Sequence, residues 1–181
     1  YLLDESEVEI PSEINGKPVT VIGNSCFMDK SLSAVTIHDS VTEIGEGAFY
    51  NCTSLTSITI PDRVTEIGLN AFYNTPWLAS QPQPVIINKI LIDYSSASGD
   101  VIIPDSVIEI GGGAFDGCTS PISVTIPDSV IEIDNYAFWD CTGLTSVIIP
   151  SSVTAIPNYT FSGCTNLTSI TIPDSVTTIS P

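Results

Sequence analysis

The single histidine of the chain, His38, is the first candidate for catalysis. A general base acts within hydrogen-bond reach of the proton that it removes, and it needs a nucleophile and a group that orients it. The sequence contains no Gly-x-Ser-x-Gly, His-Glu-x-x-His or calcium-loop pattern that would supply such partners. We therefore expect a protein that is not an enzyme and has no catalytic residue.

A glycine-rich stretch, Gly111–Gly117, has the composition of a phosphate-binding loop. It lacks the lysine with which such loops hold phosphates, and its Ala114-Phe115 dipeptide recurs elsewhere in the chain as Ala48-Phe49. We therefore expect no nucleotide here, and no other cofactor.

The five cysteines offer thiol or metal chemistry, but no two of them have the Cys-x-x-Cys spacing of a zinc site. Four of them follow a phenylalanine by three residues, at Cys52, Cys118, Cys141 and Cys164. Stacked in one column they would have parallel Cβ vectors, which disfavours disulfides. We expect all five thiols, Cys26 included, to be reduced and buried, with S–H groups donating to carbonyls along the stack, and no metal.

The acidic residues also recur in columns, and they dominate the charge of the chain. Glutamates stand at 43, 66, 109 and 132, and aspartates at 39, 62, 105, 128 and 174. Calcium needs about six to eight oxygen atoms converging on one point, which a flat column does not provide, so we expect a solvated acidic flank, with a divalent-cation site as the alternative. With 21 acidic and 4 basic residues, the net charge of −17 disfavours nucleic acid and anionic membranes as partners.

These columns exist because the chain is a repeat. The motif Val-x-x-Ile begins at residues 19, 41, 64, 107, 130, 153 and 176, at intervals of 22, 23, 43, 23, 23 and 23 residues. Phenylalanine follows the valine by eight residues in every repeat that is long enough to contain it. The interval of 43 is one normal repeat after a repeat shortened by three residues, and the shortening lies in the proline-rich stretch 73–83.

Each repeat predicts one coil of a solenoid. Leu55-x-x-Ile58-x-Ile60 alternates as a half-buried strand, and Pro61 ends it because proline cannot donate to the ladder. We expect a second extended piece at Val64–Ile67, and one helical or 3-10 turn around each Phe-x-x-Cys. One coil cannot bury this much apolar surface alone, so the coils must stack as a parallel ladder with strands about 4.8 Å apart.

The recurring unit Leu-x-x-Ile-x-Ile-Pro-Asp-Ser-Val-Thr-x-Ile-Gly-x-x-Ala-Phe-x-x-Cys resembles the BspA-like, or treponemal-type, leucine-rich repeat over residues 8–179. The resemblance implies a β-rich leucine-rich-repeat solenoid with a parallel β-sheet on its concave face and short turns on its convex side. It also implies secreted or cell-surface proteins, mostly bacterial, that are often involved in adhesion. We expect one solenoid domain over residues 1–181, of about eight coils, with irregular repeats around 73–100.

The outward-facing strand positions form the candidate binding surface. They carry β-branched side chains and no charge, at Thr36, Thr59, Ile102, Thr125, Ile148 and Thr171. Two aromatic residues outside the core columns, Trp77 and Trp139, complete the set, because tryptophan is enriched at interfaces and also stacks on sugar rings.

These features predict a non-catalytic module that docks a host or microbial protein on a rigid surface, at the cell surface or outside the cell. A structural spacer that presents another domain, and a carbohydrate-binding module using Trp77 and Trp139, are the alternatives. We expect no membrane insertion. The chain stops at Ile179-Ser-Pro181, within a repeat, so we expect a fragment of a longer solenoid whose open C-terminal end can self-associate.

Overall fold

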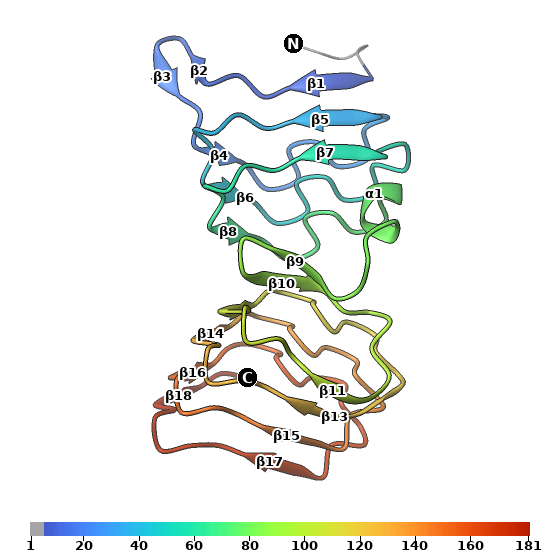
Figure 1. Ribbon diagram of the computed structural model, residues 1–181, viewed down its shortest axis with the longest axis vertical. Coiled ribbons are helices and arrows are strands. Elements are labelled where there is room, and N and C mark those ends of the chain that lie inside the picture. The colour runs from blue at the N-terminus through green and yellow to red at the C-terminus, as the bar shows by residue number, and fades with distance from the viewer. Residues whose placement is uncertain (1–5) are drawn as a thin grey trace. The chain divides into compact units, whose positions relative to one another are not determined.

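The structure is a computed structural model that describes residues 6–181 (Figure 1). Contacts divide the chain into two compact units, with the boundary between Pro82 and Gln83. This boundary lies inside the irregular stretch that the sequence indicates around residues 73–100. Each unit is a β-solenoid of stacked coils, which confirms the fold class.

In unit 1 every coil contributes one longer strand, termed the main strand, and one minor strand of two residues. The main strands β1 (Glu7–Glu9), β5 (Ala34–Thr36) and β7 (Ser57–Thr59) form a parallel sheet. The minor strands β4 (Val21–Ile22), β6 (Glu43–Ile44) and β8 (Glu66–Ile67) form another. A small antiparallel hairpin, β2 (Glu13–Ile14) with β3 (Lys17–Pro18), projects before the first minor strand.

Unit 2 repeats this plan with one more coil. Its main strands are β11 (Gly99–Ile102), β13 (Pro121–Thr125), β15 (Ser146–Ile148) and β17 (Ser169–Thr171), all parallel. Its minor strands are β10 (Ile90–Asp93), β12 (Glu109–Ile110), β14 (Glu132–Ile133), β16 (Ala155–Ile156) and β18 (Thr178–Ile179). The hairpin partner of β10 is β9 (Val85–Ile87), which runs antiparallel to it.

The described residues contain seven main strands, one fewer than the eight registers in the sequence pattern. Counting back 23 residues from Val101 reaches Leu78, which lies in the helix α1 (Pro76–Ala79) instead of a strand. Thr75 caps this helix by accepting a hydrogen bond from the Leu78 amide at 3.2 Å, and Pro76 stands at its start. The shortened repeat therefore replaces its main strand by one helical turn.

The turns around Phe-x-x-Cys are not helical, because two positions per coil adopt a left-handed backbone. The residues two before and two after each phenylalanine have positive φ, as at Gly47 and Asn51 on either side of Phe49. Amide groups then alternate: Tyr50 donates within its own turn to Gly47 at 2.9 Å, whereas Phe49 donates to Ala71 of the next coil at 2.7 Å. Half of the amides of this turn thus tie neighbouring coils together.

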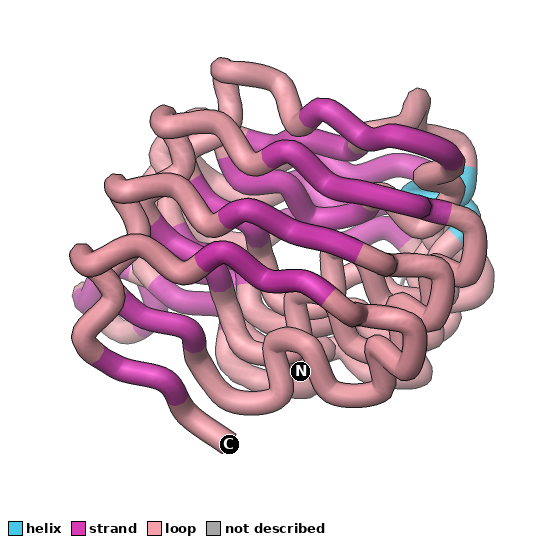
Figure 2. Tube along the Cα trace, turned by 90° about the horizontal axis from the view of Figure 1, so that it is seen from below, coloured by secondary structure: helices cyan, strands magenta, loops and turns pink. Residues whose placement is uncertain are grey.

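The core lies inside the coils, between the two strand-bearing sides that Figure 2 shows in magenta. Fully buried members include Phe49, Phe115 and Phe138, together with leucine, isoleucine and valine of both strand types. Consecutive phenylalanines stack face to face, with ring centroids 5.3 Å apart for Phe27 and Phe49 and 4.7 Å apart for Phe115 and Phe138. In the part of the chain that is described, no helix has the length and apolar character to cross a membrane.

Candidate binding surfaces

The outward face of the unit 2 main strands holds four of the eight predicted site residues. Ile102 lies opposite Thr125, Thr125 opposite Ile148, and Ile148 opposite Thr171 in adjacent strands. All four are exposed, Ile102 by 75% and Ile148 by 60%, whereas the inward neighbour Val147 is 2% exposed. The strand register therefore assembles a continuous row of β-branched side chains on this face.

A second row runs beside it on the same strands and is polar. It consists of Asp100, Ser123, Ser146 and Ser169, which are paired in register. The hydroxyl of Ser123 donates to the Asp100 carboxylate at 2.8 Å. This face thus offers apolar contact beside hydroxyl groups and carries one charge in these two rows.

The equivalent face of unit 1 holds two more predicted residues and is more acidic. Thr36 lies opposite Thr59, and Glu9 of β1 lies opposite Thr36. Glu7 adds a second exposed carboxylate to the same strand. Unit 1 therefore has the threonines of the predicted surface without its exposed isoleucines.

Trp77 lies in α1 and packs against the end of the unit 1 core. Its ring meets Phe72 edge-on, with centroids 4.9 Å apart and planes at 60°. Its amide donates to the Leu55 carbonyl at 2.7 Å, and its side chain is half-buried. These contacts give Trp77 a packing role, and its predicted binding role remains a prediction.

Trp139 is 41% exposed and belongs to an aromatic cluster in the turns of unit 2. Tyr136 meets Trp139 edge-on at 6.1 Å and stacks on Tyr159 at 5.0 Å. The carboxyl of Asp116, from the preceding coil, is close enough to Asp140 to be affected by its charge: burial and then Asp140 raise the pKa of Asp116. The sequence spacing indicates that Trp139 lies outside the core. It does not indicate that Tyr136 and Tyr159 cluster with it, or that Asp116 is affected by the charge of Asp140.

Four of the five cysteines are buried in one column, as expected, and they donate along the stack. The Sγ of Cys52 lies 3.0 Å from the Phe27 carbonyl oxygen, and that of Cys164 lies 3.0 Å from the Phe138 carbonyl oxygen. Burial raises the pKa of Cys52, and raises the pKa of Cys164 to about 11. The expectation is wrong for Cys26, which is exposed, because its coil is the first within residues 6–181 and no other coil of the described part covers that side of it.

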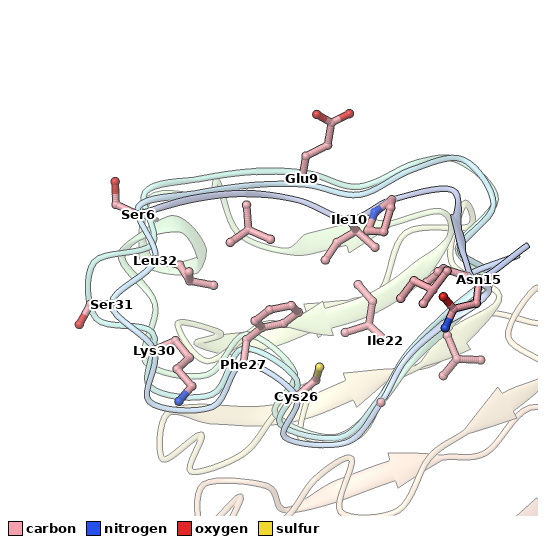
Figure 3. A pocket seen from close by; sticks show the side chains of 16 residues that line it. Ser6, Glu9, Ile10, Asn15, Ile22, Cys26, Phe27, Lys30, Ser31 and Leu32 are labelled. Atoms are coloured by element: carbon pink, nitrogen blue, oxygen red, sulfur yellow. The ribbon is translucent and has the colours of Figure 1, made fainter. Parts of the chain in front are cut away.

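Cys26 borders the hollow shown in Figure 3, of about 1040 Å³. Ile10, Ile22 and Phe27 point into it, whereas Glu9 points away. These inward residues occupy the positions that are core in the later coils. The hollow is therefore the uncovered interior of the first described coil, next to Ser6, and not a pocket with convergent polar groups.

The acidic columns and the histidine form no metal centre among residues 6–181. Glu43 lies opposite Glu66 and Glu109 opposite Glu132, so the glutamates line up along the minor strands. No cluster of three metal-ligating side chains is present in the described part. His38 is exposed, and its Nδ1 lies 3.1 Å from the Ser40 hydroxyl.

The left-handed positions are a feature that sequence reasoning missed. One column, two residues after each phenylalanine, consists of Asp29, Asn51, Asn74, Gly117, Asp140 and Gly163. Aspartate, asparagine and glycine are the residues that tolerate positive φ, so this composition could have revealed the turn. Within the column, Asn74 donates to Asn51 and Asn51 to Asp29, both at 2.6 Å.

A family model described as a BspA-type leucine-rich-repeat region matches residues 20–91 and 85–181, in six copies. Among solved structures, a leucine-rich-repeat protein of T. pallidum is 32% identical over 96% of this chain and 72% of its own, with a TM-score of 0.46. One from Bacteroides ovatus is 22% identical over 99% and 72%, with a TM-score of 0.40. A leucine-rich cell-surface protein of Faecalibacterium prausnitzii is 23% identical over 92% and 87%, with a TM-score of 0.28. No curated protein matches the chain.

Proposed function

The chain belongs to the BspA-type leucine-rich-repeat family, and from this premise we propose that it is a non-catalytic module that binds another protein. The proposed surface is the outward face of the main strands, centred on Ile102, Thr125, Ile148 and Thr171. A solenoid of this kind suits a protein-interaction role, because its rigid, repetitive surface is ordered before the partner arrives.

The exposed isoleucines carry this proposal. Ile102 and Ile148 are 75% and 60% exposed, on a face whose polar row holds hydroxyl groups. Threonine and isoleucine are also good strand formers, but strand propensity does not require an isoleucine to face water where threonine serves in neighbouring coils. An apolar row bordered by hydrogen-bonding groups matches the centre and rim of a protein interface.

We extend the proposal to the setting of the protein: adhesion to a host or microbial protein, at the cell surface or outside the cell. The family resemblance supports this, and one similar structure is described as a leucine-rich cell-surface protein. Protease treatment of intact producing cells tests the location, since a surface protein is removed while cytoplasmic markers remain. Self-association through the C-terminal coil, where Ile172 and Ile179 are 40% and 63% exposed, remains a prediction.

The binding surface is tested with two variants of equal charge change. Thr125→Arg with Ile148→Arg disrupts the proposed face, and Ser151→Arg with Thr154→Arg adds the same charge at exposed positions near the next minor strand. The two variants and the parent chain are immobilised separately. Each is then incubated with purified extracellular-matrix proteins and with surface extracts of neighbouring bacteria. We expect the face variant to lose binding and the control variant to keep it.

Equal binding by both variants would overturn the assignment of the face. Binding of no protein by the parent chain would favour the spacer. Binding to a glycan array that disappears in Trp77→Ala with Trp139→Ala would favour the carbohydrate-binding alternative.

A further inference from the structure

Trp139 is exposed although its coil has a neighbouring coil on each side within unit 2. The position that follows the core phenylalanine holds Asp116 in the coil before it and Ser162 in the coil after it. Both neighbours are attached by backbone hydrogen bonds: Gly117 donates to the Trp139 carbonyl at 3.0 Å, and Asp140 donates to the Ser162 carbonyl at 2.8 Å. The 41% exposure of the indole is therefore set by the solenoid surface itself.

The indole is also held in place before any ligand binds. Tyr136 meets it edge-on, with ring planes at 80°, and Tyr136 is fixed in turn by its stack on Tyr159. An aromatic side chain that is already ordered loses little conformational entropy on binding. This favours Trp139 as a contact residue over an exposed side chain that rotates freely.

Two acidic residues flank Trp139 in the chain and in the stack: Asp140 follows it in sequence, and Asp116 holds the equivalent position in the preceding coil. Asp116 and Asp140 are neighbours whose like charges raise the pKa of Asp116, after the larger effect of burial. Residues 90–181 contain ten Asp and Glu residues and no Lys, Arg or His. A cation placed over the indole would relieve this repulsion, and the nearest basic residue in sequence is Lys89.

We propose that Trp139, with Asp116 and Asp140 beside it, is a docking site for an arginine side chain of an extended basic segment in a partner protein. A guanidinium group stacks on an indole face and donates hydrogen bonds to carboxylates from the same plane. A neutral sugar could donate hydroxyl groups to the two carboxylates, but unlike a guanidinium group it would not neutralise their charge. This surface lies on the turns, apart from the main-strand face, so the two sites are tested independently.

Tryptophan fluorescence provides the test, in a Trp77→Phe background that leaves Trp139 as the sole tryptophan. The probes are three blocked pentapeptides of sequence Gly-X-Gly-X-Gly, with X as arginine, lysine or the neutral arginine isostere citrulline. We expect a saturable change with the arginine peptide, weaker binding of the lysine peptide and none with citrulline. Affinity should fall as salt is raised, since about 0.1 M salt screens charges beyond about 10 Å.

Two double variants of equal net charge distinguish binding at a defined site from general electrostatic attraction between the acidic chain and the peptide. Asp116→Asn with Asp140→Asn should weaken arginine-peptide binding by about three- to tenfold, the range for two charged contacts at the surface, of which Asp116 is half-buried and Asp140 exposed. Asp105→Asn with Asp128→Asn removes two exposed charges elsewhere, and should change binding by less than about twofold. Equal weakening by both pairs, binding of the citrulline peptide, or equal binding of the lysine peptide would each overturn the proposal.

Discussion

The two units close their aromatic stacks differently where the repeat is interrupted. Unit 1 stacks Phe27, Phe49 and Phe72 almost parallel and then adds Trp77 at 60°. Unit 2 begins with Tyr94, tilted by 37° on Phe115, and continues with near-parallel rings. Parallel stacking therefore follows from the regular repeat, and an aromatic side chain from irregular sequence covers each stack where that repeat breaks.

This difference shows how the solenoid tolerates an interruption. A phenylalanine left without a neighbour would expose one ring face to water, at a cost of about 25 cal/mol for each Å² of apolar surface. Trp77 and Tyr94 remove that exposure without a regular coil. The irregular stretch thus completes the core of each unit, and its aromatic residues do not need a ligand to explain them.

The reactivity of the cysteines should show the largest difference between covered and uncovered coils. Cys26 is exposed in the first described coil, whereas Cys52, Cys118, Cys141 and Cys164 are buried. We expect Cys26 to react with a thiol reagent in the native protein at least about a hundredfold faster than the others, which need local or global opening. Timed labelling with peptide mapping measures this, and equal labelling of Cys26 and Cys141 would contradict the burial pattern.

Removal of a ring from the middle of a stack should have the largest effect on stability. Phe138 is fully buried between Phe115 and Phe161, with centroids at 4.7 and 5.3 Å. Phe138→Ala should lower the free energy of unfolding by about 3–5 kcal/mol, because it leaves a cavity between three coils. Thr125→Ala, on the exposed face, should cost well under about 1 kcal/mol. Denaturant midpoints in the reverse order would contradict the inward register.

Substitutions of Trp77 test whether the stability of unit 1 depends on the aromatic ring that covers the end of its phenylalanine stack. Trp77→Ala should lower the free energy of unfolding by about 2–3 kcal/mol, less than a fully buried tryptophan, because the ring is half-buried. Trp77→Phe retains an aromatic contact with Phe72 and should recover most of this loss. If urea denaturation shows equal stability for Trp77→Ala and the parent chain, the packing role is wrong.

Two glycines of the left-handed column in unit 2, Gly117 and Gly163, allow the cost of backbone strain to be compared with the cost of steric crowding. Gly117 has φ +65° and open space where a Cβ would lie, whereas a Cβ at Gly163, with φ +77°, would lie 2.9 Å from the Asp140 Cα. Gly117→Ala should cost about 1 kcal/mol from strain alone. Gly163→Ala should cost about 1–2 kcal/mol more, because the Asp140 backbone must move. Thermal denaturation of both variants measures the difference.

The smallest change in stability is expected for a substitution of Asp116. This substitution should stabilise the protein, whereas most substitutions destabilise it. The pKa of this carboxyl is raised in the folded state, so folding favours its protonated form. The protonated carboxyl therefore contributes to the free energy of unfolding at acid pH, and this contribution is lost as pH rises through the folded pKa. Asp116→Asn, which is always neutral, should therefore be more stable than the parent chain at pH 7, by less than about 1 kcal/mol. The difference should vanish in acid. A destabilised variant at pH 7 would show that burial and the charge of Asp140 do not disfavour the ionised carboxyl.

Much of the architecture could be predicted from the repeat because each repeated residue meets the same neighbours. The strand at Ser57–Thr59, the buried phenylalanine column and the exposed row at Thr125 and Ile148 all agree with the pattern. One of the eight expected main strands is replaced by α1, since proline at 76 cannot donate to the ladder and begins a helix. The turns differ from the expected helical ones because apolar spacing carries no information on backbone φ, which here depends on the Asp, Asn and Gly residues that accept positive values.

The sequence by itself determined the period, the inward columns and the excess of acidic charge, because these depend on residue type and spacing alone. Only the tertiary structure decided which side chains are covered. Cys26 and Phe27 occupy core positions, yet their burial depends on a neighbouring coil. Trp77 and Trp139 are both tryptophans outside the columns, yet Trp77 packs on Phe72 whereas Trp139 is 41% exposed beside Tyr136. In a stacked fold, burial and electrostatic environment belong to pairs of adjacent coils, and no single repeat contains that information.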